Sequence, residues 1–124
     1  MTAESVLRSA LTLIGEQSDS TCFTEAALCS LQRIVLETQP LYTAYLAAYG
    51  QENTPEKPIC CLSDELPCPT VLFPAFVYAL ASALCHSYNA EYADVLAEKY
   101  RAVCRGLWEV LPATVHPVQD CYSE

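Results

Sequence analysis

The chain has 124 residues, of which 52% are hydrophobic and 17% charged, and its formal net charge is −9. This length and composition are typical of one globular domain, and they exclude both a disordered chain and a protein with two full cores. Six basic residues cannot neutralise a nucleic-acid backbone along its length, so we expect no sequence-specific nucleic-acid binding.

The first half of the sequence predicts two helices and a third, shorter one. Thr2 is a suitable cap for a first helix, whose apolar residues recur on one side until Gly15 ends it. A second helix is expected over residues 24–38, because Pro40 lacks a backbone N–H and disfavours a helical residue before it. Residues 41–49 are then expected to form a separate short helix.

The second half of the sequence predicts a long loop and two further helices. Residues 51–69 contain four prolines and no sustained period, which indicates an extended loop or arm. A third helix over residues 70–88 is apolar on nearly every face and must be surrounded by protein, with Pro74 either in its first turn or at a kink. Asn89 can cap a fourth helix over residues 91–111, which has one apolar and one charged side.

These elements predict an all-α fold: a single small bundle of four to five helices with a long proline-containing loop and an extended C-terminal tail. Residues 1–111 form the helical domain, and residues 112–124, which have no helical period, form an extended or disordered arm. The longest apolar stretch, 71–84, is shorter than the roughly 20 residues that cross a bilayer, and the first residues lack the features of a signal peptide. We therefore expect a cytoplasmic protein that does not bind a membrane.

Eight cysteines raise the question of disulfides or a zinc site. They are Cys22, Cys29, Cys60, Cys61, Cys68, Cys85, Cys104 and Cys121. A cytoplasmic setting disfavours disulfides, and the C-x2-4-C pairs that zinc sites usually contain are absent from the sequence. We therefore interpret the cysteines as structural or incidental thiols and assign no metal ligands. A zinc-binding adaptor that uses Cys60, Cys61, Cys68 and a distant Cys or His stays open as an alternative.

The two histidines and the acidic loop do not form a recognisable catalytic or cofactor site. His86 and His116 lack a suitably spaced nucleophile, because Cys85 points about 100° away from His86 on a helix. Asp64 and Glu65 lack the alternating ligands and turn glycine of a calcium loop, and the three glycines form no phosphate-binding loop. We therefore assign no catalytic and no cofactor-binding residue, and we expect that the chain is not an enzyme.

The eight tyrosines are a more informative excess. Tyr42, Tyr45 and Tyr49 recur on one side of the segment after Pro40. Tyrosine has a large apolar body and a polar tip, and it is enriched at protein interfaces. Two interpretations stay open: the three side chains pack on the domain's own core, or they form part of a contact surface.

Several short patterns resemble the small head–tail connector, or adaptor, proteins of tailed bacteriophages and prophages. In that family a loop of the form L-x-D-E-L-P precedes a hydrophobic helix, as at Leu62–Pro67, and a Y-x-L-A/A-x-L core follows, matched by Tyr78–Leu84. A later helix carries tyrosines and a K-Y pair, matched by Tyr92 and residues 99–101. The segment 30–50 resembles the family's second helix and the turn after it.

The resemblance covers roughly residues 24 to 110, and the sequence departs from it in its many cysteines and in Pro74. It implies an all-helical, non-enzymatic adaptor that forms a ring beneath the portal, receives the tail or stopper proteins, and lets DNA pass through its centre. The loop 51–69 and the tail 112–124 are then the expected contacts between subunits or with portal and tail. The protein would be found first in the cytoplasm of the bacterial host and then in the virion neck.

A second hypothesis is a small helical regulatory, toxin-neutralising or interaction protein of a mobile element that acts as a dimer. It predicts a defined small oligomer and a basic or tightly bound protein target, whereas the connector predicts assembly on a portal.

Overall fold

The computed structural model describes residues 1–15, 24–49, 59–87 and 89–111. These residues form four α-helices and a short 3-10 turn, and they contain no β-strand beyond an isolated bridge between Thr2 and Glu65. The elements are α1 (Ala3–Leu13), α2 (Thr24–Ala48), η2 (Thr70–Leu72), α3 (Phe73–Cys85) and α4 (Ala90–Val110). The predicted all-α fold is confirmed.

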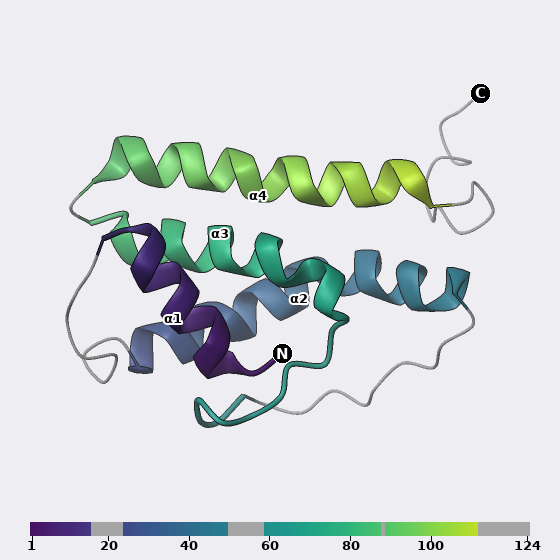
Figure 1. The fold of residues 1–124 in the computed structure, drawn as a ribbon, viewed down its shortest axis with the longest axis horizontal. Coiled ribbons are helices and arrows are strands. Elements are labelled where there is room, and N and C mark those ends of the chain that lie inside the picture. Colours follow the sequence, from purple (N-terminus) through teal and green to yellow (C-terminus); the bar gives the residue numbers. More distant parts are fainter. Residues whose placement is uncertain (16–23, 50–58, 88, 112–124) are drawn as a thin grey trace.

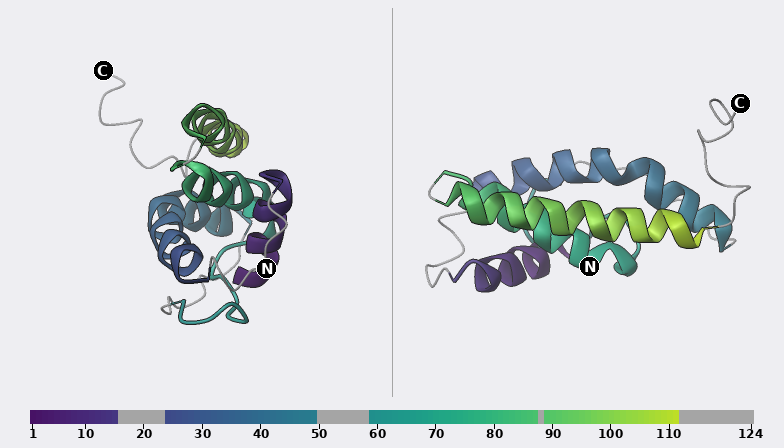
Figure 2. Two further views of the ribbon diagram at one scale, coloured as in Figure 1. Left: turned by 90° about the vertical axis from the view of Figure 1, so that its left-hand side faces the viewer. Right: turned by 90° about the horizontal axis from the view of Figure 1, so that it is seen from above.

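The helices lie in three layers with α3 in the middle. α1 and α2 lie on one side of α3, and α4 lies along its opposite side (Figures 1 and 2). α3 contacts α1, α2 and α4, whereas α2 and α4 touch each other at few places. The arrangement follows from the sequence of α3, because a helix that is apolar on all sides is stable only when other elements cover each side.

The core is therefore centred on α3. Phe76 and Leu80 of this helix are fully buried, as are Leu7 of α1 and Leu31 of α2. On the side of α4, Ser82 donates a hydrogen bond of 2.7 Å to the carbonyl of Ala93. Small and polar-tipped side chains of α3 let α4 approach closely on this side.

α2 differs from the prediction, because Pro40 does not end it. A single helix runs from Thr24 to Ala48 with Pro40 inside it, and it changes direction part of the way along (Figure 1). Pro40 cannot donate to the carbonyl of Leu36, but Leu36 is exposed and water can bond that carbonyl. The buried hydroxyl of Thr38 donates to Ile34 and Val35 carbonyls at 2.9 and 3.3 Å, a pattern that bends helices.

Burial explains why the helix continues beyond the proline. Leu41, Tyr42, Ala44 and Leu46 are buried, so ending the helix at residue 38 would expose apolar surface already packed on the core. Burying a leucine side chain contributes about 2 kcal/mol, so several such residues together offset the roughly 3 kcal/mol cost of an interior proline. The separate helix predicted over 41–49 was wrong for this reason.

The ends of α1 and α4 agree with the predicted caps. The hydroxyl of Thr2 accepts a hydrogen bond from the backbone N–H of Ser5 at 3.2 Å, and the Asn89 side chain accepts one from Tyr92 at 3.1 Å. Gly15 has a φ of +75°, the left-handed conformation that only glycine adopts without strain. Each of these helices therefore begins or ends where its sequence indicates.

α3 is shorter than predicted at both ends. Residues 70–72 form a 3-10 turn, and the α-helix begins at Phe73, so Pro74 occupies the first turn, where its missing N–H costs nothing. The helix ends at Cys85, whose carbonyl accepts a hydrogen bond from Asn89 at 2.8 Å. The kink that was the alternative interpretation of Pro74 does not occur.

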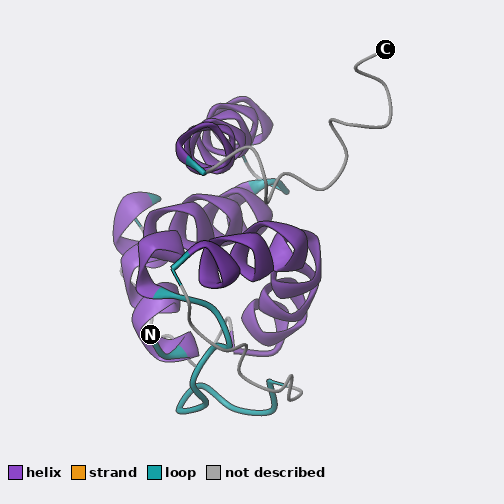
Figure 3. Cartoon of the chain, turned by 90° about the vertical axis from the view of Figure 1, so that its right-hand side faces the viewer, coloured by secondary structure: helices purple, strands orange, loops and turns teal. Residues whose placement is uncertain are grey.

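The described part of the predicted loop, residues 59–69, packs beside the start of the chain (Figure 3). The N–H groups of Ala3 and Glu4 donate to the carbonyls of Asp64 and Leu62 at 3.1 and 2.8 Å. The N–H of Leu66 donates to the carbonyl of Met1 at 2.9 Å, and the side chains of Ile59, Leu66 and Cys68 are buried. This segment thus bonds the free N–H groups at the start of α1 and covers that end of the core.

The remaining predictions on the loop and tail concern residues that the structure does not describe. Residues 51–58 and the predicted arm 112–124, which includes His116, Cys121 and the two C-terminal acids, lie outside the described ranges, as does Cys22.

Candidate functional site

One surface depression of the described part is a groove between α2 and α4, and α3 forms the floor of its first hollow. It consists of two adjoining hollows of about 480 and 370 Å³, which share Glu37, Tyr100 and Arg101. We call this depression the α2–α4 groove. The first hollow is lined by Arg33, Glu37, Ala79, Ser82, Ala83, His86, Ala97, Tyr100 and Arg101, and the second adds Thr38, Pro40, Leu41, Cys104, Arg105 and Trp108.

Helical spacing explains why these residues share one groove. The α4 residues of the wall, from Ala97 to Trp108, follow one another at intervals of three, one, three, one and three, which places them on one face. The floor residues Ala79, Ser82, Ala83 and His86 have the same spacing on α3. The alanines of the floor have short side chains, so space stays open between α2 and α4 above them.

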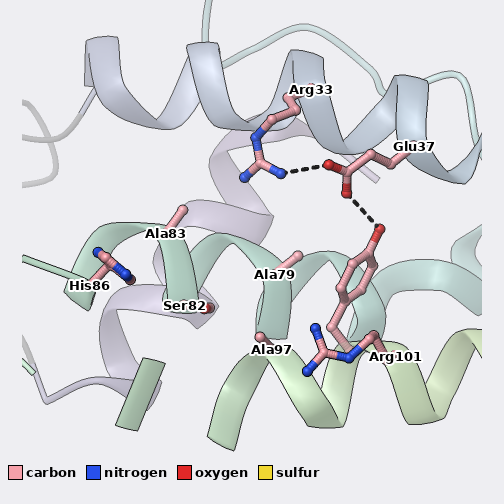
Figure 4. Close-up of a pocket in the computed structure, with 9 residues that line it drawn as sticks. Arg33, Glu37, Ala79, Ser82, Ala83, His86, Ala97 and Arg101 are labelled. Carbon is pink, nitrogen blue, oxygen red and sulfur yellow. Dashed lines mark hydrogen bonds and ion pairs between the residues drawn. The ribbon is translucent and has the colours of Figure 1, made fainter. Parts of the chain in front are cut away.

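Arginines occupy both walls of the groove. Figure 4 shows Arg33 on α2 and Arg101 on α4 around the first hollow, with the alanines of α3 between them. Arg33 donates to Glu37 at 2.7 Å, while Arg101 and Arg105 donate to the two carboxylate oxygens of Glu98 at 2.9 and 3.2 Å. Three guanidinium groups face two carboxylates, which leaves one positive charge in a chain with a net charge of −9.

Tyr100 connects the two walls. Its hydroxyl donates a hydrogen bond of 3.2 Å to one carboxylate oxygen of Glu37. The other oxygen of Glu37 accepts from Arg33 (Figure 4). Burial, together with the nearby Cys104 and Glu37, raises the pKa of Tyr100 well above its usual range. The phenol therefore stays protonated and keeps donating this hydrogen bond.

The second hollow is the more apolar end of the groove. Pro40 and Leu41 of α2 face Cys104 and Trp108 of α4 across it. Burial, and then the carboxylate of Glu37, raises the pKa of the Cys104 thiol, which therefore stays neutral and behaves as a small apolar group. The groove thus joins a charged end to an apolar end.

The histidine that the sequence singled out lies at the charged end of the groove. His86 is exposed just after α3 and lines the first hollow together with Arg33. Its neighbour Cys85 is buried and directs its thiol toward the backbone carbonyls of Ser82 and Asn89. The structure does not bring the two side chains together, in line with the expected difference of direction on a helix.

Cysteines of the described part do not gather into a metal site. Among the described residues, no group of three or more histidine, cysteine or acidic side chains could hold a metal ion. Cys60 and Cys61 are exposed beside Asp64, which accepts hydrogen bonds from both of their backbone N–H groups at 2.8 and 3.1 Å. Cys68 is buried away from solvent, and this burial raises the pKa of its thiol to about 12.

The three tyrosines after Pro40 differ in burial, so some fit the interpretation as core residues and others the interpretation as a contact surface. Tyr42 is buried in the core, Tyr45 is half-buried, and Tyr49 is exposed over 58% of its surface. The rings of Tyr45 and Tyr49 lie 4.7 Å apart, centroid to centroid, at the end of α2. Tyr42 therefore serves the core, while Tyr49 remains available for a contact.

The α2–α4 groove was not predicted from the sequence as a site. Two signals for it were present: the local group of Lys99, Arg101 and Arg105, and the run of alanines in the third helix. What the sequence could not supply was the position of Arg33, which is 68 residues before Arg101 and reaches the groove only through the packing of α2 beside α3.

No family model, curated protein or solved structure matches the chain. Among the described residues, no helix has both the length and the apolar character needed to span a membrane.

Proposed function

We propose that this chain is a structural assembly protein of a tailed bacteriophage or prophage, a head–tail connector that oligomerises on the portal and joins the capsid to the tail. The observation that carries the proposal is the α2–α4 groove, which presents a tryptophan, a tyrosine and three arginines around one depression. These three residue types are the ones that contribute most to the binding energy of protein interfaces.

Two further observations support the proposal. The patterns at Leu62–Pro67 and Tyr78–Leu84 resemble the connector family, and the all-helical fold agrees with what that resemblance implies. The first pattern also has a structural role here, since it supplies the carbonyls that bond the N–H groups of Ala3 and Glu4. The acidic balance of the chain suits a ring through which DNA passes without adhering.

In this proposal the protein acts without catalysis. It is made in the cytoplasm of the bacterial host and then forms part of the virion neck, with the loop 51–69 and the tail 112–124 as further contacts to neighbouring subunits, portal or tail proteins. The groove adds a contact that the sequence patterns did not indicate.

The test is co-expression with the portal protein encoded in the same gene cluster, followed by purification on a tag carried by the portal and by electron microscopy. The proposal predicts that the chain co-purifies and forms a ring stacked on the portal. Failure to co-purify, together with a dimer in solution that binds a basic protein, would contradict it and favour the regulatory protein of a mobile element.

A further inference from the structure

Positive charge is unevenly distributed over this acidic protein. Three of its six basic residues, Arg33, Arg101 and Arg105, line the α2–α4 groove. Their side chains are between 54% and 60% exposed, so each guanidinium can reach a ligand in solution. The groove is therefore the place in the described part of the chain where an anionic group would meet the most basic side chains.

The local charges decide what the groove attracts. At physiological ionic strength the Debye length is about 8 Å, so the acidic residues on distant faces of the molecule are largely screened. The three arginines that line the groove outnumber the carboxylates that they bond, Glu37 and Glu98. A guanidinium has five N–H donors, more than its bonds to one carboxylate use. An incoming carboxylate can thus bond to these arginines while their own ion pairs persist.

The apolar lining of the second hollow indicates that the ligand also has an apolar group. Beside the charged hollow lies the hollow lined by Pro40, Leu41, Cys104 and Trp108, in which apolar side chains would be covered. A free anion such as phosphate would bond the arginines alone and leave these apolar side chains uncovered. A peptide that carries acidic residues next to an apolar one matches both ends.

We infer that the α2–α4 groove binds an acidic segment of a partner protein, with carboxylates at Arg33 and Arg101 and an apolar side chain against Trp108. The inference rests on the proposed function in one respect: it takes the segment to belong to an assembly partner. It goes beyond the proposed function by naming the chemistry that this partner presents and the residues that recognise it.

The chain provides its own reporter for this binding. Trp108 is the single tryptophan, and it lines the apolar hollow, so its fluorescence reports on the occupied groove without a label. The probe is a short synthetic peptide of alternating glutamate and leucine, and the reference is the same peptide with lysine in place of glutamate. We expect a saturable blue shift of Trp108 emission with the glutamate peptide, weakened by added salt, and none with the lysine peptide.

Two charge-reversal variants separate the groove from the general charge of the protein. Arg101→Glu is expected to weaken binding of the glutamate peptide at least tenfold, because it replaces an attraction with a repulsion. Arg8→Glu is the matched control, since Arg8 is also an exposed arginine paired with a glutamate on its own helix, but it lies on α1 outside the groove. It should change the affinity less than twofold, and circular dichroism should show both variants folded.

Three results would overturn the inference. The first is no saturable shift, or an equal shift with the lysine peptide. The second is equal weakening by Arg101→Glu and Arg8→Glu. The third is self-association of the native chain that Arg101→Glu abolishes, which would place a second copy in the groove.

Assembly distinguishes this inference from the proposed function. If Arg101→Glu assembles on the portal as the native chain does, the inference is wrong and the connector function stands. If the native chain binds the glutamate peptide but not the portal, the groove's specificity stands and the connector function is wrong.

Discussion

α1 and α4 both pack on α3, yet they are attached in different ways. α1 buries five of its 11 residues, and the segment 62–66 bonds its first N–H groups. α4 buries two of its 21 residues, Ala93 and Leu96, and leaves a groove beside α2 that is lined by charged and aromatic side chains. Both helices pack on α3, but the rest of the chain covers a larger part of the surface of α1 than of α4.

This difference indicates a division of roles. Burial of α1 contributes mainly to folding, because apolar area removed from water is the dominant stabilising term. α4 has apolar side chains that are only half-buried, such as Leu107 and Trp108, next to arginines that stay exposed. In the proposed function, these half-buried and exposed side chains of α4 are the ones that a partner would contact.

The largest expected effect is on the free energy of unfolding, when a leucine is replaced by alanine once in α1 and once in α4. Leu7→Ala removes a fully buried side chain of α1 and should lower the free energy of unfolding by about 3–5 kcal/mol. Leu107→Ala removes a half-buried side chain of α4 and should cost about 1 kcal/mol. Urea unfolding followed by circular dichroism measures both, and equal costs would contradict the division of roles.

Replacing the interior proline of α2 is expected to stabilise the protein. Pro40→Ala supplies the missing N–H for the carbonyl of Leu36, and Pro40 is exposed, so no packing is lost. The gain should be about 1–2 kcal/mol after the greater entropy of the unfolded chain is subtracted. A loss of stability in thermal unfolding would instead show that the bend itself is needed to bury Leu41 and Tyr42.

Two tyrosine hydroxyl groups of α4 donate hydrogen bonds to two different helices, α1 and α2. Tyr92 donates to the carbonyl of Leu13, the last residue of α1, at 3.2 Å, and Tyr100 donates to Glu37 of α2 at 3.2 Å. Tyr92→Phe and Tyr100→Phe should each cost about 1 kcal/mol of unfolding free energy. Because the two residues lie eight positions apart, the double variant should be additive to within about 0.5 kcal/mol, and a larger coupling would show that the two attachments act as one.

The smallest expected effect is the contribution of Glu98 to the pH dependence of stability. Hydrogen bonds from Arg101, and then from Arg105, lower the pKa of Glu98 in the folded protein, so the unfolded chain takes up the proton first as pH falls. The stabilisation is present above the carboxyl's ordinary pKa of about 4.3 and is lost as pH falls through the lower, folded value. Glu98→Gln should therefore lose less stability on acidification than the native chain, and parallel pH profiles would contradict this.

Much of the fold could be predicted because the relevant physics is local. The apolar faces of α3 required neighbours on all sides, and Thr2, Gly15 and Asn89 act within a few residues of their own positions. Pro40 misled the prediction, because its cost is local whereas the compensation comes from residues that become buried only in the folded protein.

The candidate site could not be predicted for the same reason. Arg33, Ala79 and Arg101 belong to three helices, and no local pattern states that they face one depression. The contact between Leu62–Leu66 and the start of α1 is equally non-local: the resemblance drew attention to this segment, but its bonds to Ala3 and Glu4 appear only in the structure.

The most direct test of the division of roles is hydrogen–deuterium exchange on the native chain, alone and assembled on the portal. Alone, amides of α4 should exchange faster than those of α1, since α4 buries a smaller share of its residues. On assembly, residues 33–41 of α2 and 97–108 of α4 should gain protection, while α1 and residues 62–66 stay unchanged. New protection confined to α1 and residues 62–66 would contradict the account.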